Sequence, residues 1–392
     1  MIVDVSQIRD ARRWLMLALG VFAQTSSSIF IHGTPFLLPA LTARGDSLAS
    51  AGALVALPTM GLVCTLIAWG YVVDKIGERV ALVAGALLMC VAGIGAALVD
   101  SPIAFAALLF VGGMGAGSSN SASGRLIVGW FPPDRRGVAM GIRQAAQPLG
   151  VGIGAMTIPW VAQHHGISSA LLVPAIMGGL AAIGCLIGVI DPARPPTKAA
   201  DRANPYRGDS TLWRIHAVSI LLVIPQGTLW TFGLLWLHSD LGWSLAAAGA
   251  LMTVTQFLGA AGRIGAGAWS DRVGSRLTPL RQVAIAAAIT MAALAVTTWT
   301  DWWWAAVPLM VAASVISVSD NGLAFTAVAE IAGPFWSGRG LGIQNTGQNL
   351  AIAFVPPVFG AVIAATGFPT VYALAAVGAA AAIPLVPRSP RK

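Results

Sequence analysis

Twelve apolar segments, each long enough to cross a bilayer, follow one another along this chain of 392 residues. A transmembrane helix needs about 20 mostly apolar residues. The segments cover residues 14–38, 48–72, 79–99, 102–130, 137–162, 168–190, 212–238, 245–269, 281–299, 303–330, 338–364 and 368–387. Only 10% of the residues are charged, too few to cover a soluble domain, which carries roughly 25%. We therefore expect an all-α membrane protein with twelve transmembrane helices, and the composition excludes a soluble enzyme, a nucleic-acid-binding protein and a disordered chain.

The basic residues predict the orientation of these helices. If both termini are cytoplasmic, 19 of the 23 Lys and Arg residues fall in cytoplasmic segments and only Arg44 falls in an outer loop, as the positive-inside rule requires. The formal net charge of +8 then follows from topology and does not indicate nucleic acid as a partner. The alternative, a cleaved signal peptide ending near Val21-Phe22-Ala23, would disturb this alternation. We predict a multi-pass protein of the cytoplasmic (inner) membrane.

A polar, proline-rich stretch from Asp191 to Ser210 is the longest interruption of the apolar pattern, and it divides the segments into six plus six. It predicts an N-terminal six-helix bundle over residues 1–190, a cytoplasmic linker over 191–211 and a C-terminal six-helix bundle over 212–392. The three cysteines all lie in apolar segments. Their odd number and their positions indicate neither a disulfide framework nor a metal site, and we expect no cofactor.

The two halves of the chain repeat each other. Residues 70–79 and 267–276 share the pattern Gly-x-x-x-Asp-basic-aliphatic-Gly-x-Arg and lie 197 residues apart, and residues 141–149 align with 342–350 at an offset of 201. At nearly the same offset, further matches pair Ser118-Ser119-Asn120 with Ser319-Asp320-Asn321 and Gln24 with Gln226. Several matches at one offset indicate a parallel internal repeat, an arrangement in which the substrate binds near the bilayer midplane.

The duplicated loop motif, in a chain with twelve spans, resembles the major facilitator superfamily, and the resemblance covers the whole chain. Residues 130–137 and 330–340 are also similar to the family's loops after spans 4 and 10. The resemblance implies two pseudo-symmetric bundles around a central cavity, which rock against each other to give alternating access. It also implies that spans 1, 4, 7 and 10 line the cavity, while spans 2, 5, 8 and 11 lie at the interface between the bundles.

Charged residues of these loops are predicted to gate the cytoplasmic side. The motif aspartates can pair with basic residues or cap nearby helix N-termini, and the motif arginines can pair with acidic groups at neighbouring helix ends. Such contacts would break and re-form during rocking, or else they only fix topology and loop shape. The candidate gating residues are Asp74, Arg79, Asp134, Asp271, Arg276 and Glu330, with Asp134 and Glu330 as the expected partners of the two arginines.

Four ionisable residues fall inside the predicted spans, where charge is costly and usually functional. Arg125 can snorkel to the cytoplasmic surface. Arg143 and Arg263 can approach one site from opposite halves and bind an anion through their planar guanidinium groups. The position of Arg263, eight residues before the motif Asp271, also resembles the monocarboxylate and oxalate/formate branches of the family, in which this Arg holds the substrate carboxylate. Three Arg against one Asp leave an excess of buried positive charge for an anionic substrate, although Arg263 can instead pair with Asp320.

Two roles are open for Asp320. It can carry a proton, because burial disfavours the charged form of a carboxyl group, or it can be a fixed counter-ion of Arg263. The first role would make the protein a proton-coupled transporter, for example a symporter. The second role favours uniport or anion exchange.

Further polar side chains inside the spans are expected to line the cavity and contact the substrate. For any one of them the alternative is an interhelical hydrogen bond, which contributes about 0.6 kcal/mol. Those in the repeated positions stand out because both halves carry them. The predicted substrate-binding residues are Arg143, Arg263, Gln24, Asn120, Gln147, Gln226, Gln256, Asn321, Gln344 and Gln348.

The chain also departs from part of the family's pattern. Many members carry an Arg early in span 4, where this chain has residues 108–110, Leu-Leu-Phe, and residues 147–152 keep only part of the glycine-rich exporter pattern. Multidrug/proton antiport is therefore the first alternative function, and a non-transporting membrane sensor is the second. An enzyme is not expected, because the spans carry no catalytic or metal-binding constellation. We predict a monomeric secondary active transporter for a small, carboxylate-like organic anion.

Overall fold

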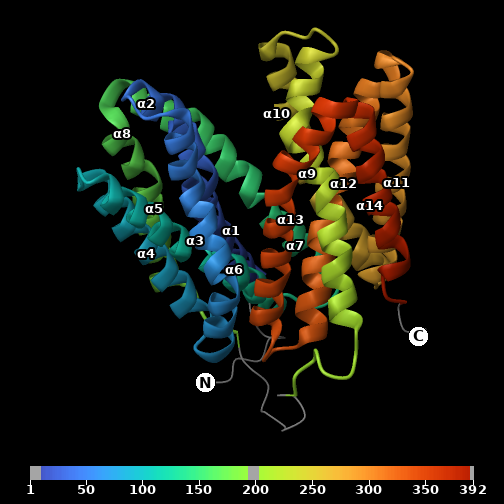
Figure 1. Cartoon of the computed structure of the whole chain (residues 1–392). Coiled ribbons are helices and arrows are strands. Elements are labelled where there is room, and N and C mark those ends of the chain that lie inside the picture. Colours follow the sequence, from blue (N-terminus) through green and yellow to red (C-terminus); the bar gives the residue numbers. More distant parts are fainter. Residues whose placement is uncertain (1–9, 193–202, 389–392) are drawn as a thin grey trace. The chain divides into compact units, whose positions relative to one another are not determined.

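The computed structural model describes residues 10–192 and 203–388, so that residues 193–202 of the predicted linker lie outside the described residues. Within them the chain forms helices and no strand (Figure 1). The first half contains α1 (Asp10–Gly33), the 3-10 helix η2 (Thr34–Leu37), α2 (Leu38–Ala43), α3 (Leu48–Lys75), α4 (Glu78–Leu98), α5 (Pro102–Ala116), α6 (Ser118–Trp130), α7 (Arg136–Gln144) and α8 (Ala146–Gly188). The second half contains α9 (Thr211–Ser239), α10 (Leu245–Val273), α11 (Leu277–Trp299), α12 (Trp303–Ala332), α13 (Ser337–Thr366) and α14 (Phe368–Leu385).

The helices agree with the twelve predicted spans. Ten described segments are long and apolar enough to cross a membrane. One of them, Arg136–Gly188, contains two predicted spans, which separate where Gly166 has a φ of 83°. The remaining predicted span, 245–269, lies within the helix α10. Large apolar side chains such as Ile103 and Met156 are more than four-fifths exposed, as expected of a surface that faces lipid.

Local sequence signals explain where several helices begin. Ser47 and Ser244, which are 197 residues apart, each accept a hydrogen bond from the backbone N–H three residues further on, and so cap α3 and α10. Ser101 caps α5 in the same way. In the two motif loops, Gly77 and Gly274 have φ angles of 127° and 66°. These positive values explain why both copies of the motif carry glycine at the turn.

Two spans are interrupted along their length, which the sequence analysis did not predict. The span over 102–130 consists of α5 and α6, which separate at Gly117, and α7 separates from α8 at Ala145. The second break has a cause in the sequence. Pro148 has no N–H to donate to the carbonyl of Gln144 four residues earlier, so that one helical hydrogen bond is missing there.

The described residues divide into two compact units. Unit 1 consists of the described residues within Met1–Pro132, Ala145–Asn204 and Ala329–Asn345. Unit 2 consists of those within Pro133–Gln144, Pro205–Val328 and Thr346–Lys392. Each unit therefore contains most of one half of the chain and a short segment of the other half. Residues 133–144, which include α7, belong to unit 2, and residues 329–345 belong to unit 1.

Each unit has an apolar core of its own. In unit 1, Ile29, Leu109 and Ile158 bring α1, α5 and α8 together. In unit 2, Trp236 and Tyr372 belong to one cluster that joins α9, α11, α12 and α14. These packed helices hold the polar side chains described next at fixed positions inside each unit.

Candidate functional site

Two buried arginines of unit 2 converge on the end of α7. Arg143 is 1% exposed and Arg263, on α10, is 2% exposed. Arg143 Nη1 donates a hydrogen bond to Gln144 Oε1 at 2.8 Å, and Arg263 Nη1 donates one to the backbone oxygen of Gln144, also at 2.8 Å. The two guanidinium groups thus share one residue as an acceptor.

The local sequence explains why Arg263 can reach this carbonyl. The oxygen of Gln144 lacks its helical partner because residue 148 is proline, and Arg263 supplies the missing donor. The helices also approach closely at Gly141. A Cβ atom at that position would lie 2.6 Å from the backbone oxygen of Arg263. Glycine at 141 and proline at 148 therefore both contribute to the position of the arginine.

The Arg263 guanidinium has only neutral partners within the described residues. Its Nε donates to the Val318 carbonyl at 3.4 Å and its Nη1 to Gln144, while Nη2 makes no hydrogen bond there. No described carboxylate lies within 4.0 Å of the group. Arg143 also lies 5.7 Å from the centre of the Phe325 ring, a cation–π distance.

Asp320 on α12 is 1% exposed, and neither of its carboxylate oxygens has a hydrogen-bond partner in the described part of the chain. Arg263 is the cation that acts on it electrostatically. The two side chains do not form an ion pair within 4.0 Å, so that the direct pairing considered above is not formed in this structure. Unit 2 therefore contains a buried carboxyl group, that of Asp320, and a buried guanidinium group, that of Arg263, which interact electrostatically but form no ion pair.

The repeated Gln and Asn residues are hydrogen-bonded to each other in both units, with donor and acceptor exchanged between the units. In unit 2, Asn321 Nδ2 donates to Gln226 Oε1 at 3.0 Å, and Gln348 Nε2 donates to Asn321 Oδ1 at 2.9 Å. In unit 1, Gln24 Nε2 donates to Asn120 Oδ1 at 3.4 Å. These bonds join different helices, which is the alternative role considered for such residues.

The other predicted substrate-binding residues are distributed over both units. Gln147 and Gln344 belong to unit 1, with Gln24 and Asn120. Gln147 Nε2 lies 3.3 Å from His32 Nε2, and Gln344 is buried. Gln256, in unit 2, is half-buried on α10 and makes no hydrogen bond within the described residues.

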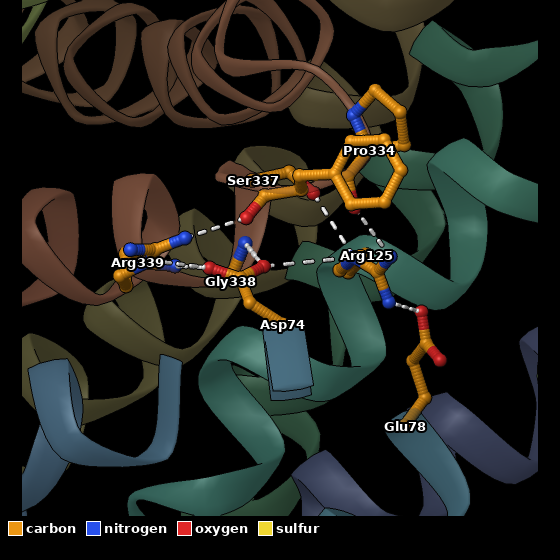
Figure 2. A network of polar contacts seen from close by, with 8 residues as sticks. Asp74, Glu78, Arg125, Pro334, Ser337, Gly338 and Arg339 are labelled. Carbon is orange, nitrogen blue, oxygen red and sulfur yellow. Dashed lines mark hydrogen bonds and ion pairs between the residues drawn. The ribbon is translucent and has the colours of Figure 1, made fainter. Parts of the chain in front are cut away.

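The first motif aspartate caps the start of α13, and both belong to unit 1 (Figure 2). Asp74 accepts hydrogen bonds from the backbone N–H groups of Gly338, at 2.8 Å, and Arg339, at 3.0 Å. The Arg339 side chain also donates to it through Nε at 2.8 Å. A carboxylate at a helix N-terminus is stabilised by the unpaired N–H groups there. Gly70 makes the approach possible, because any Cβ atom would collide with the Gly338 carbonyl.

The second motif aspartate does the same in unit 2. Asp271 accepts hydrogen bonds from the N–H groups of Gly137 and Val138, both at 2.9 Å, at the start of α7. Gly137 and Gly338 are 201 residues apart, so that the two caps are equivalent by the internal repeat. Both roles considered for the motif aspartates, helix capping and pairing with arginine, are therefore combined, because Asp271 also pairs with Arg276.

The sequence suggested that Arg125 snorkels to the surface, but in the structure its side chain is buried. It is 4% exposed, forms an ion pair with Glu78, and its Nε lies 3.8 Å from Asp74 Oδ1 (Figure 2). It also donates to Ser337 Oγ at 3.1 Å and to the Pro334 carbonyl at 2.6 Å. The excess of buried positive charge counted from the sequence is thus smaller. Arg125 has two acidic neighbours, so that its charge does not add to this excess.

The remaining gating candidates have different neighbours from those expected. The backbone N–H of Arg79 donates to Asp191 Oδ1 at 2.7 Å. Within the described residues Arg79 pairs with neither Asp134 nor Glu330, and Asp134 is exposed. Arg276 pairs with the aspartate of its own motif, and the bond closes the loop on itself. The expected partnership between the motif arginines and these two acids is therefore not found for Arg79.

The roles of two contributors, Glu78 and Gln144, were not predicted from the sequence. Glu78 is the first residue of α4 and directly follows the motif glycine, so that its place in the repeated loop was a signal for a charged partner. Gln144 was the other. Its carbonyl could have been recognised as unpaired from Pro148, but its contact with α10 could not.

Residues 14–356 match the family model described as the Major Facilitator Superfamily. The chain belongs to this superfamily. Over 379 residues it is 50% identical to an uncharacterized MFS-type transporter of Mycobacterium tuberculosis, and the match covers 96% of this chain and 85% of the relative. The twelve helices are therefore those of a multi-pass membrane transporter.

More distant matches of this transporter carry more specific names. The probable galactarate/D-glucarate transporter GudP of Bacillus subtilis is 26% identical over 293 residues, which cover 67% of this chain and 64% of the relative. The oxalate:formate antiporter of Oxalobacter formigenes is 28% identical over 169 residues, which cover 43% and 40%. Among solved structures, the proton:xylose symporter XylE shares the fold with a TM-score of 0.77 at 17% identity, over 96% of this chain and 95% of XylE.

Proposed function

We propose that this protein is a secondary active transporter for a small, carboxylate-like organic anion, and that Arg263 and Arg143 hold the substrate. The observation that carries the proposal is the state of Arg263, which is buried with no carboxylate within 4.0 Å in the described residues. A buried charge without a counter-ion is expensive, whereas a bound anion would compensate it. An anionic substrate would therefore supply the counter-ion that Arg263 lacks.

The hydrogen bonds of Arg263 leave one donor group, Nη2, available to such a ligand. The carbonyls of Val318 and Gln144 occupy Nε and Nη1 and fix the plane of the guanidinium group. Nη2 would then donate to a carboxylate oxygen, in a charge-assisted bond that is roughly twice as strong as a neutral one. Arg143, fixed by the same Gln144, would supply the second cationic contact.

Neutral polar residues would complete the site. In unit 2 these are Gln226, Asn321 and Gln348, which already form a connected chain of hydrogen bonds. Gln256 would contribute from α10. The predicted residues of unit 1, Gln24, Asn120, Gln147 and Gln344, would contact the substrate from the other half during the transport cycle.

Asp320 is proposed as the group that couples transport to protons. Its two oxygens have no hydrogen-bond partner in the described residues, and Arg263 acts on it without an ion pair. An anion that binds Arg263 would remove part of the positive charge that stabilises the Asp320 carboxylate. Substrate binding would therefore favour uptake of a proton by Asp320, which corresponds to symport of an anion and a proton.

The names of the distant relatives support the substrate class. Galactarate, glucarate, oxalate and formate are all carboxylates. Arg263 would correspond in its role to the arginine that the oxalate/formate branch uses for the substrate carboxylate. The proposal is limited to this class, since the matches cover only part of each relative.

The capped helix starts are proposed to gate the transporter. The contacts of Asp74 with Gly338 and Arg339, and of Asp271 with Gly137, would open and close together with the cytoplasmic side. The charge distribution supports this orientation, with both termini in the cytoplasm and the protein in the inner membrane. We further propose that the protein works as a monomer, because one chain supplies all the residues of the proposed site.

The experiment is uptake into proteoliposomes that contain the purified protein, with a panel of radiolabelled carboxylates, nitrate and cationic dyes. At least one carboxylate should accumulate. Arg263→Ala should lower its uptake by about 10- to 100-fold, which corresponds to losing a hydrogen bond to a charged group. Arg143→Ala should also lower uptake. Arg281→Ala is the matched control, because Arg281 is exposed on α11 and should not affect transport.

Three results would contradict the proposal in different ways. If Arg263→Ala and Arg143→Ala transport anions like the unmodified protein, the arginines do not hold the substrate. If only the dyes move, the protein is a drug exporter. If Asp320→Asn leaves the acidification that accompanies uptake unchanged, Asp320 is not the coupling group, whereas loss of acidification with continued anion exchange would support it.

A further inference from the structure

Unit 2 contains a cavity of about 200 Å³ that none of the proposed substrate-binding residues lines. It lies at the C-terminal end of α9, next to the end of α11 and the start of α12. Its walls include Trp236, Asp240, Thr298, Asp301 and Trp303. The volume is below the range of about 300 to 1,000 Å³ of drug-sized sites, so that only a small chemical group fits.

Two exposed carboxylates, those of Asp240 and Asp301, line this cavity. Asp240 accepts a hydrogen bond from Ser239 Oγ at 3.0 Å, and neither Asp240 nor Asp301 has an ion pair within 4.0 Å among the described residues. Two like charges that share one small space repel each other, and a cation between them would relieve the repulsion. The charge of the cavity therefore favours a positively charged ligand.

Unpartnered polar atoms of the same cavity point to a ligand independently of the acids. Trp236 is 1% exposed, yet its Nε1 has no hydrogen-bond partner in the described residues, and the same is true of the buried Thr298 Oγ1. Behind Trp236, the Tyr372 ring packs edge-on at 5.9 Å between centroids, and its hydroxyl also lacks a partner there. Buried polar atoms are nearly always hydrogen-bonded, so that two exceptions in the wall of one cavity require an explanation.

The backbone at the cavity is also unusual. Asp301 has a φ of 56°, the one non-glycine residue with positive φ in the described part of the chain. The turn is held by a hydrogen bond from the N–H of Trp302 to the Thr297 carbonyl at 2.8 Å. Asp tolerates this conformation better than most residues, and such positions concentrate at ligand sites. The turn thus keeps the Asp301 side chain at the wall of the cavity.

The aromatic side chains favour an organic cation over a bare metal ion. Trp236 and Trp303 both line the cavity, and tryptophan is the best aromatic partner for an ammonium group. Trp299, Trp302 and Trp304, next to it in sequence, are all more than half exposed. Exposed tryptophans concentrate where a membrane meets water, which is the level of the lipid headgroups.

We propose that this cavity binds an ammonium group, presented either by a zwitterionic lipid headgroup or by a small soluble amine. The ammonium lies between the carboxylates of Asp240 and Asp301 and against the tryptophan rings. An oxygen of the same ligand, from its phosphate or hydroxyl group, accepts the hydrogen bond of Trp236 Nε1. The site is separate from the proposed anion site and does not depend on it.

The test uses the full-length purified protein and measures its melting temperature and its retained lipids. Ethanolamine and choline chloride are compared with sodium chloride at equal ionic strength, and nanodiscs of phosphatidylethanolamine are compared with nanodiscs of phosphatidylglycerol. The amine or the zwitterionic lipid should raise the melting temperature. In the double variant Asp240→Asn/Asp301→Asn its affinity should fall at least tenfold, and in Trp236→Phe, which keeps a ring and loses the N–H, it should fall severalfold.

A matched control comes from the internal repeat. Asp100 aligns with Asp301 at the offset of 201 residues and is exposed, so that Asp100→Asn should leave the effect unchanged. If the double variant does not fold, Asp301→Asn alone replaces it, because Asp301 is exposed. Stabilisation by the lipid alone identifies a headgroup site, and stabilisation by the soluble amines identifies an amine site. Stabilisation by neither, or only by calcium or sodium, overturns the proposal.

Discussion

The two units carry the same Gln–Asn pair but differ at the residue beside the asparagine. Ser119 precedes Asn120 in unit 1, and its hydroxyl donates to Gln24 Oε1 at 3.1 Å. Asp320 precedes Asn321 at the equivalent place in unit 2, and its carboxylate has no hydrogen-bond partner in the described residues. One unit is therefore neutral and satisfied at this level, while the other is charged and incompletely paired.

A second pair of positions differs in the same direction. At the offset of 201 residues, Arg143 aligns with Gln344 and Pro148 with Asn349. The helix α13 continues through the region where α7 and α8 separate. The charge of Arg143 and the Gln144 carbonyl without a helical partner therefore occur together, where α7 separates from α8. This comparison separates the shared polar scaffold, present in both units, from the few charged side chains on which a transport function can depend.

Placing a charge in the neutral unit should have the largest effect. Ser119→Asp would bury a carboxylate among the neutral side chains of Gln24 and Ser27, with which Ser119 now makes hydrogen bonds. We expect a loss of about 3–5 kcal/mol in the free energy of unfolding, because a buried charge would lack a partner. The melting temperature in detergent measures it, with Ser119→Asn as the neutral control. Equal melting of the two variants would show that unit 1 can accommodate charge, and the contrast between the units would fail.

Adding a methyl group where two helices are in close contact should have the next largest effect. Gly141→Ala would place a Cβ atom 2.6 Å from the Arg263 carbonyl, and Gly342→Ala would place one 2.6 Å from that of Leu66. Each should destabilise the protein by about 1–3 kcal/mol. Only Gly141→Ala should also strongly reduce anion uptake, because it displaces an arginine. Gly152→Ala, which meets no atom within 4 Å, is the control for both measurements.

Neutralising the two motif aspartates tests whether their caps are equivalent. Asp74→Asn should lower the free energy of unfolding by about 2 kcal/mol and Asp271→Asn by about 1 kcal/mol, the scale of a charged group at a helix N-terminus. The first loss should be larger because Arg125 lies 3.8 Å from Asp74 and would keep only Glu78 as an acidic partner. Thermal melting of both variants gives the order. A larger loss for Asp271→Asn would mean that the Arg125 network contributes little.

Removing the shared polar pair should have the smallest effect on stability. Asn120→Ala should cost about 0.6 kcal/mol, the average of an interhelical hydrogen bond in a membrane protein. Asn321→Ala should cost somewhat more, because Asn321 bonds both Gln226 and Gln348. Uptake should fall more in Asn321→Ala, because Asn321 follows Asp320 in unit 2. Proteoliposome uptake and melting temperature, measured on the same preparations, separate the two effects. Equal uptake by both variants would indicate that the substrate contacts the two units alike.

Much of the fold followed from the sequence because composition determines it. Apolar length located the twelve spans, and the repeated motif located the two glycine turns. Charged partners were harder to predict, since pairing depends on which helix ends are adjacent. Arg125 was assigned to the surface because its partner, Glu78, lies 47 residues away. The meeting of Arg263 with Gln144 required the close approach of two helices, which Gly141 permits but does not by itself reveal.

Each unit includes a short segment from the other half of the chain, and this has a consequence for biosynthesis. Unit 1 includes residues 329–345, and its buried Asp74 obtains its backbone donors from Gly338 and Arg339. During synthesis this aspartate is inserted long before its partners leave the ribosome. The first six transmembrane helices therefore lack some of their contacts until the eleventh transmembrane helix has been translated. Truncated chains that end before residue 338 should accordingly be targets for membrane proteases.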